Sequence, residues 1–178
     1  MIKLLSISSL LCLLFIASPK GKTFPELQGE KLTGEQVSIP KDIGDKVSIV
    51  GMAYSKKSEA TLKTWYQPMF DKFVLKRGIF DAQYDVNLLF VPMFTGGKKA
   101  AYNVSMKQMK ESNREDLYPY LLFYKGDLEP YVSELEMDNK EFPYLFILDE
   151  NGSILYSTKG VFNEKKMEEI EAVLDARL

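Results

Sequence analysis

The chain contains no histidine and only one cysteine, Cys12, among its 178 residues. Histidine is the side chain that most often serves as a general base near neutral pH, and it is also the commonest ligand of transition metals. The net charge is only −2, which gives no electrostatic reason to expect a nucleic-acid partner. We therefore expect no metal, no cofactor and no nucleic acid.

Residues 1–22 differ in kind from the rest of the chain. Lys3 precedes an apolar run over residues 4–17, which is shorter than a membrane span of about 20 residues but has the length of a secretory h-region. No arginine precedes Arg77, which disfavours a mitochondrial transit peptide. We interpret residues 1–22 as a signal peptide that exports the protein, to the periplasm or cell envelope if the source is bacterial and otherwise into the secretory pathway.

Two questions about this segment stay open. No clear small-x-small cleavage site follows the apolar run, so an uncleaved segment that associates with the membrane is an alternative to a removed signal. Cys12 lies within the run, where bulky Leu11 occupies the position that lipidation motifs give to a small residue. A small apolar side chain in a signal is the favoured interpretation of Cys12. The mature domain, residues 23–178, then has no thiol.

In residues 23–178, continuous apolar runs typical of buried strands alternate with apolar residues at helical spacing. Residues 46–54 and 84–91 are nearly continuous apolar runs, which predict strands covered on both faces, the second ending at Pro92. Residues 55–74 repeat apolar side chains at helical spacing and predict an amphipathic helix kinked at Pro68, because proline lacks the backbone donor. This order predicts parallel strands joined by crossover helices.

Weaker sequence patterns predict the remaining elements, and together they predict an α/β domain with a mixed sheet flanked by helices. Turn glycines predict an N-terminal β-hairpin in residues 23–40, and Asn151 and Gly152 predict a hairpin turn in which both residues have positive φ. The remaining expected elements are a helix over 98–112, a strand over 118–124, a helix over 128–137, strands over 142–148 and 154–157, and a closing helix capped by Asn163.

Three stretches carry a resemblance: FPELQGEKLTGEQVSIP, VSIVGMAYSKKSEATLKTW and EFPYLFILDENGSIL. They resemble the lead-in, the first core strand with its active-site helix, and the cis-proline strand of thioredoxin-like proteins of the exported thiol-disulfide and peroxiredoxin-related type. YLLFYKGDLEPYVSELEMDNKEFPYLFILDENGSILYSTKG, with FPELQGEKLTG, also resembles the thioredoxin-like assembly factor of mitochondrial ATP synthase. The resemblance spans nearly the whole mature chain and implies a thioredoxin-like fold.

The resemblance places Ser55 and Ser58 where redox thioredoxins carry two cysteines. An alcohol is a far weaker acid than a thiol and forms no disulfide, so neither thiol exchange nor peroxide reduction can run on these two residues. Ser55 is expected to cap the helix, with Ser58 an ordinary first-turn residue. The same exposed amides, with Lys56 and Lys57, could instead receive a carboxylate or phosphate.

Pro143 corresponds in the resemblance to the superfamily's cis-proline. A cis bond would turn the backbone of Phe142 outward beside Ser55, where thioredoxins pair with an extended peptide. The alternative is a trans proline that begins the strand.

These observations predict an exported, redox-inactive thioredoxin-like protein that binds a protein or peptide partner. It would act as a chaperone, an assembly factor or a component of an envelope complex, without catalytic residues. One alternative is an auxiliary role in a thiol-disulfide exchange system. Another is an enzyme with a serine nucleophile, which is disfavoured because a serine-lysine pair would need an inward-directed lysine. The predicted contact surface is Tyr54, Ser55, Lys56, Ser58, Phe142 and Pro143.

Overall fold

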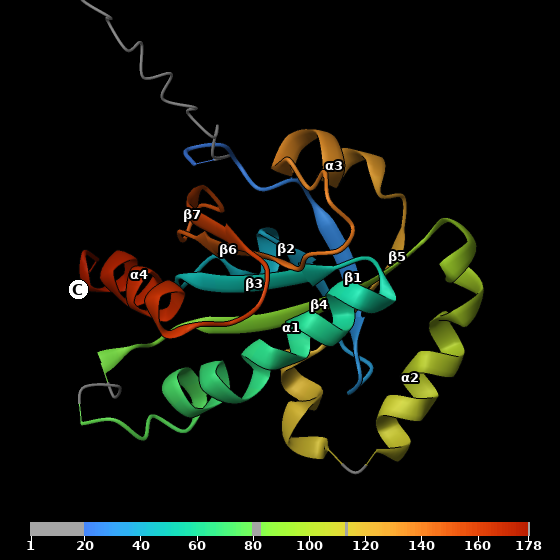
Figure 1. Ribbon diagram of the computed structural model, residues 1–178, viewed down its shortest axis with the longest axis horizontal. Helices are drawn as coiled ribbons and strands as arrows, with labels where there is room; N and C mark the ends of the chain where they lie inside the picture. The colour runs from blue at the N-terminus through green and yellow to red at the C-terminus, as the bar shows by residue number, and fades with distance from the viewer. Residues whose placement is uncertain (1–19, 80–82, 113, 178) are drawn as a thin grey trace, which may run out of the picture.

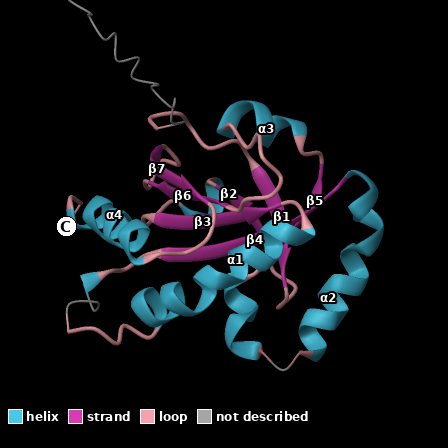
Figure 2. Ribbon diagram, viewed as in Figure 1, coloured by secondary structure: helices cyan, strands magenta, loops and turns pink. Residues whose placement is uncertain are grey.

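The computed structural model describes residues 20–79, 83–112 and 114–177, so most of the predicted signal peptide lies outside the described residues. Seven strands form one mixed sheet in the order β2-β1-β5-β4-β3-β6-β7 (Figures 1 and 2). No helix within the described ranges is long and apolar enough to cross a membrane. The strands are β1 Leu27–Lys31, β2 Gln36–Ile39, β3 Ser48–Ala53, β4 Asn87–Thr95, β5 Leu122–Gly126, β6 Tyr144–Leu148 and β7 Ile154–Lys159.

Four α-helices and several shorter helical turns lie between and after the strands in the part of the chain that the structure describes. The shorter turns are η1 Lys41–Ile43, η2 Phe70–Val74, η4 Gly96–Ala101 and η5 Glu115–Tyr120. The α-helices are α1 Lys56–Met69, α2 Tyr102–Glu111, α3 Glu129–Leu135 and α4 Glu164–Asp175. Asn163 caps α4 as expected, since its side-chain oxygen accepts the N–H of Lys166 at 3.0 Å.

The strand directions confirm the mixed sheet and the N-terminal hairpin. β3 pairs with β4, and β4 with β5, in parallel, as the strand-helix-strand order predicted. β1 pairs antiparallel with both β2 and β5, while β6 pairs antiparallel with both β3 and β7. β3 therefore lies inside the sheet, and all six of its residues are buried.

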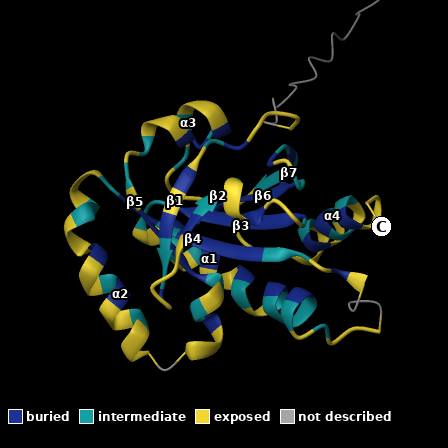
Figure 3. Ribbon diagram, turned by 180° about the vertical axis from the view of Figure 1, so that it is seen from behind, coloured by how far each residue is buried: buried dark blue, intermediate teal, exposed yellow. Residues whose placement is uncertain are grey.

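The sheet divides the core into two layers because successive side chains of a strand point to opposite faces. Ile49 belongs to the layer under α1, α2 and α4, and Val50 to the layer that includes α3 and the N-terminal segment. Figure 1 shows α3 on one side of the sheet and the other α-helices on the opposite side. The central strands are buried, whereas much of the outer surface of α2 and α3 is exposed (Figure 3).

Pro68 lies near the end of the helix predicted over residues 55–74. The α-helical part ends at Met69, and the chain continues as the π-type turn η2. Proline cannot donate the hydrogen bond of an α-helical residue, and the rare π-type winding begins two residues after it. The long helix is therefore present, but as two segments of different winding.

Two predicted strand limits are wrong because of prolines. β4 does not end at Pro92 but continues to Thr95: Pro92 occupies the last pairing position with β3, after which Met93 pairs with Tyr124 of β5. The segment 118–124 begins as the 3₁₀ helix η5, which contains Pro119, and becomes strand only at Leu122.

The predicted hairpin turn before β7 is present with a different geometry. Only Gly152 has a positive φ, +78°, and Asn151 does not. The carboxylate of Asp149 instead accepts the backbone N–H groups of Asn151 and Ser153, at 2.9 and 2.7 Å. Such side-chain to backbone bonds fix an Asx-type turn, so only one residue needs the left-handed region.

Gly152→Ala tests how tightly this turn is packed. A Cβ there would lie 2.4 Å from the Cβ of Pro40, in addition to the cost of a positive φ. Gly34, with φ +91° and open space, is the matched control. We expect Gly34→Ala to lower the unfolding free energy by about 1 kcal/mol and Gly152→Ala by roughly 1–3 kcal/mol more, measured by urea denaturation. Equal losses would contradict the packing argument.

Candidate functional site

The register of β3 and β6 brings the predicted contact residues together. Met52 pairs with Tyr144 in this antiparallel ladder, so the chain leaving β3 and the chain entering β6 meet at one end of the sheet. Tyr54 and Ser55 follow β3, and Phe142 and Pro143 precede β6. Residues 136–142, which link α3 to β6, lie across the start of α1 and are called the strap below.

Ser55 and Ser58 form a reciprocal capping box. Ser58 N–H donates to Ser55 Oγ at 3.0 Å, and Ser55 N–H donates to Ser58 Oγ at 2.9 Å. The predicted capping role of Ser55 is thus confirmed. Ser58 is 0% exposed, so it is not the ordinary first-turn residue that we expected but a buried member of the cap. Serine at this position needs a hydrogen-bond partner when buried, and the capping box supplies it.

Three side-chain contacts attach the strap to the residues around Ser55. Ser55 Oγ donates to the carbonyl of Lys140 at 2.5 Å, and Tyr54 Oη donates to the carbonyl of Met137 at 2.7 Å. Lys57 and Glu141 form an exposed ion pair at 2.9 Å. The hydrogen bond from Lys57, and then the positive charge of Lys57, lower the pKa of the Glu141 carboxyl. The strap is therefore bonded to the residues that the resemblance assigned to a peptide-binding surface.

Hydrogen bonds within the strap further limit backbone pairing. Asn139 N–H donates to Tyr144 Oη at 2.8 Å, and Phe142 N–H donates to the carbonyl of Asn139 at 3.3 Å. The backbone donor of Phe142, which we expected to pair with an extended partner, is thus occupied inside the chain. A partner that pairs with this N–H would have to displace the strap turn.

The expected cis bond before Pro143 is not present. Across the described residues the only cis peptide bond is Ile39–Pro40, so Pro143 is the trans proline that begins a strand. Its carbonyl accepts Gly160 N–H at 3.0 Å, directly before β6. Proline lacks a donor but keeps its acceptor, which suits the first position of a strand.

The site lacks the groups needed to activate Ser55 as a nucleophile. Lys56 is exposed at the first position of α1, and Lys57 is paired with Glu141. Neither lysine is directed inward, as a serine-lysine mechanism would require. Anion binding at the helix start is also disfavoured, because the Ser55 hydroxyl already donates to Lys140 and the Glu141 carboxylate lies beside Lys57.

Phe142, the last residue of the strap, and Val161, which follows β7, have exposed apolar side chains. Tyr144 pairs with Lys159 between β6 and β7, and continuing this register places Phe142 opposite Val161. These side chains are 39% and 55% exposed, two of the five exposed large apolar side chains among the described residues. Sequence analysis missed Val161, because an isolated apolar residue after a strand carries no periodic pattern.

The apolar pair rests on a rigid base. Trp65 Nε1 of α1 donates to the carbonyl of Gly160 at 2.9 Å, and the Trp65 ring contacts Phe162 edge-to-face with centroids 5.3 Å apart. Lys166 donates to the carbonyls of Lys159 and Val161 at 2.7 and 2.9 Å. The backbone that carries Val161 is therefore held on both sides.

Comparison with known proteins gives a family and a fold. A family model described as ATP10 protein matches residues 14–176. No curated protein matches the chain.

Solved structures similar to this chain confirm the thioredoxin-like fold. A protein described as a thiol:disulfide interchange protein DsbE, from Chlorobium tepidum, has a TM-score of 0.56 at 17% identity, over 89% of this chain and 99% of that one. BsSco, of the Sco family of cytochrome c oxidase assembly proteins, has a TM-score of 0.58 at 15% identity, covering 90% and 96%. An exposed lipoprotein thioredoxin from Streptococcus pneumoniae has a TM-score of 0.54 at 13% identity, covering 82% and 97%.

Alanine substitutions test the capping box. We expect Ser55→Ala to lower the unfolding free energy by about 1–2 kcal/mol and Ser58→Ala by about 1–3 kcal/mol, since Ser58→Ala leaves the buried N–H of Ser55 unpaired. The double variant should lose less than the sum, because both residues share one network. Ser133→Ala, which removes a hydroxyl bonded within α3, is the control and should change stability by less than about 0.5 kcal/mol. Additive losses in urea denaturation would argue against a shared box.

The ion pair between Lys57 and Glu141 predicts a pH dependence of the strap. The pKa of Glu141 in the folded protein lies below its ordinary value of 4.5. The ion pair therefore stabilises the fold fully above pH 4.5, and this stabilisation is lost as the pH falls through the folded pKa of Glu141. NMR titration of the Glu141 carboxyl should show a higher pKa in Lys57→Gln than in the wild type. Lys56→Gln, at the neighbouring lysine, should leave this pKa nearly unchanged. A response to both substitutions alike would mean that general charge, not the pair, lowers the pKa.

Proposed function

The chain belongs to the ATP10 protein family, and from this membership we propose that it is an assembly factor that holds a protein partner without covalent chemistry. The resemblance to the assembly factor of mitochondrial ATP synthase makes an ATP synthase the proposed target complex. The apolar N-terminal segment supports the accompanying proposal that the chain is exported across a membrane or remains associated with one.

The observation that carries this function is the exposed pair of Phe142 and Val161 beside a closed Ser55 site. Neighbouring exposed apolar side chains are typical of protein contact sites, and the register continued from β6 and β7 places these two residues opposite each other. The residues that the resemblance places at the redox positions of a thioredoxin here form a capping box in which Ser58 is buried. Recognition is therefore supported where electron transfer is not.

The geometry favours side-chain contact over strand pairing as the binding mode. Phe142 N–H is already bonded to Asn139, so a partner gains little from the backbone at this point. Phe142 and Val161 instead offer exposed apolar side chains at opposite register positions, and Lys56 is exposed at the first position of α1. We propose that an apolar partner side chain packs on this pair, while Lys56 meets an acidic group at the rim.

Phe142→Asp combined with Val161→Asp tests the proposal. Introducing two carboxylates into an apolar contact should weaken partner binding at least about tenfold, because central apolar anchors dominate interface energies. In cells that depend on the protein, the amount of assembled ATP synthase on native gels should fall at an unchanged level of the variant.

Val104→Asp is the matched control, since Val104 is also an exposed apolar residue, 57% exposed, but lies on α2. It should support normal assembly. Normal assembly in the Phe142 and Val161 double variant would overturn the proposed contact surface. Normal assembly in cells that lack the protein altogether would overturn the proposed target complex.

A further inference from the structure

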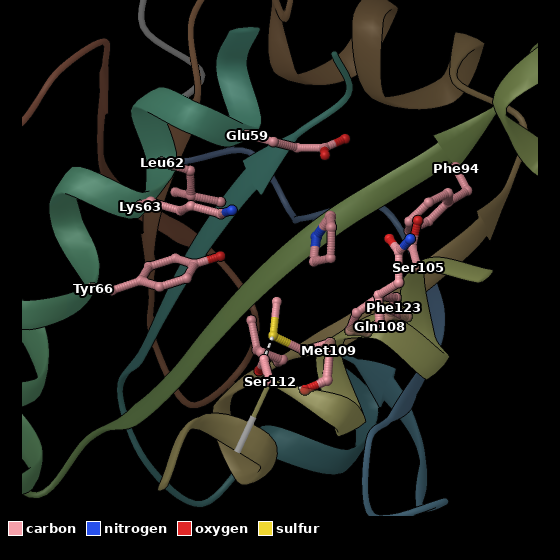
Figure 4. Close-up of a pocket in the computed structure, with 12 residues that line it drawn as sticks. Glu59, Leu62, Lys63, Tyr66, Phe94, Ser105, Gln108, Met109, Ser112 and Phe123 are labelled. Carbon is pink, nitrogen blue, oxygen red and sulfur yellow. Dashed lines mark hydrogen bonds between the residues drawn. The ribbon is translucent and has the colours of Figure 1, made fainter. Parts of the chain in front are cut away.

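A cleft of about 270 Å³ lies between α1 and α2, away from the strap. Its floor is formed by Pro92 and Phe94 of β4 and Phe123 of β5, and Leu62 and Met109 contribute from the two helices. Figure 4 shows these helices facing one another across the opening, with the strand between them. The volume is near the lower end of the range for small-molecule sites, roughly 300–1,000 Å³. It suits a single ring or a branched apolar group.

Two polar side chains of the cleft, Lys63 and Tyr66, can donate hydrogen bonds to a ligand. The side chains of Lys63 and Tyr66 extend from α1 toward the opening, and Gln108 of α2 lies across from them (Figure 4). Burial, and secondarily the charge of Glu59, raises the pKa of Tyr66 well above its usual value. The Tyr66 hydroxyl is therefore protonated at neutral pH and can donate.

The cleft carries one positive charge, on Lys63, that no acidic side chain of the lining balances. Glu59, the acidic residue of the lining, is paired with Lys98 at 2.5 Å. Lys63 has no ion-pair or hydrogen-bond partner anywhere in the described part of the chain. An apolar cleft with one uncompensated ammonium and a neutral donor beside it is complementary to an apolar group that carries a carboxylate.

We propose that the cleft between α1 and α2 binds a carboxylate with a ring-sized apolar body, its ring on Phe94 and Phe123 and its carboxylate at Lys63 and Tyr66. Such a group can be a free aromatic acid or the C-terminal residue of a peptide. The proposal does not depend on the proposed assembly function, because the cleft contains none of the residues at the Ser55 surface.

Binding of 3-phenylpropionate to the full chain, measured by calorimetry or ligand-observed NMR, tests the proposal. We expect saturable binding at one site, and at least about tenfold weaker binding of 3-phenylpropanamide, which lacks the charge. Lys63→Gln should weaken binding of the acid about tenfold and leave the amide unaffected. Tyr66→Phe should weaken the acid by a smaller factor.

Two further variants separate the cleft from general effects. Lys107→Gln removes an exposed lysine of α2 that does not line the cleft, and it should bind the acid like the wild type. Ser105→Phe places a ring in the cleft and should abolish binding of both ligands. Thermal unfolding of each variant, followed by circular dichroism, shows that the fold is retained.

Peptides that end in phenylalanine, with a free or an amidated C-terminus, identify the source of the carboxylate. Tighter binding of the free-acid peptide than of 3-phenylpropionate supports a peptide C-terminus, and the reverse order supports a free acid. Three results would overturn the proposal: no saturable binding, equal affinity for acid and amide, or equal effects of Lys63→Gln and Lys107→Gln.

Discussion

The hydroxyl of Ser55 joins the two parts of the molecule on which the site depends. It accepts the N–H of Ser58, which fixes the start of α1, and it donates to the carbonyl of Lys140, which fixes the strap. The Oγ atom of Ser55 thus makes one hydrogen bond at the start of α1 and another to the strap. This is possible only because the antiparallel pairing of β3 and β6 brings residues 55 and 140 to the same end of the sheet.

The hydroxyls of Ser55 and Ser58 have structural roles at the two positions where the resemblance expects cysteine sulfur. A thiolate at a helix start is reactive because the helix dipole stabilises it while it stays accessible. Here Ser58 is fully buried and Ser55 is bonded on both sides. The amides that would stabilise a thiolate are used to hold the cap. The hydroxyls of Ser55 and Ser58 are therefore used to join the start of α1 to the strap, and the partner contact that we propose lies at Phe142 and Val161.

The extent to which sequence predicts this molecule differs between periodic and nonperiodic features. The buried strand β3, the helix from Lys56 and the cap at Asn163 follow from local patterns, because burial and capping act over a few residues. The strap contacts could not be derived, since the bond from Ser55 to Lys140 spans 85 positions and depends on strand register. The resemblance implied a cis bond at Pro143, yet whether an X-Pro bond is cis is decided by its tertiary surroundings. Val161 was missed for a similar reason, because only pairing with β6 places it opposite Phe142.

Helix α1 contributes residues to two surfaces, the one beside the strap and the cleft beside α2. Its first turn is closed by the strap, and Trp65 anchors its middle to Gly160. About two and three turns beyond the cap, Lys63 and Tyr66 face the open cleft on the side of α2. A helix fixed at its start and middle loses little further freedom when a ligand binds, and such preorganisation lowers the entropic cost of association. The contacts that fix α1 therefore also hold Lys63 and Tyr66, the proposed carboxylate-binding groups, in position.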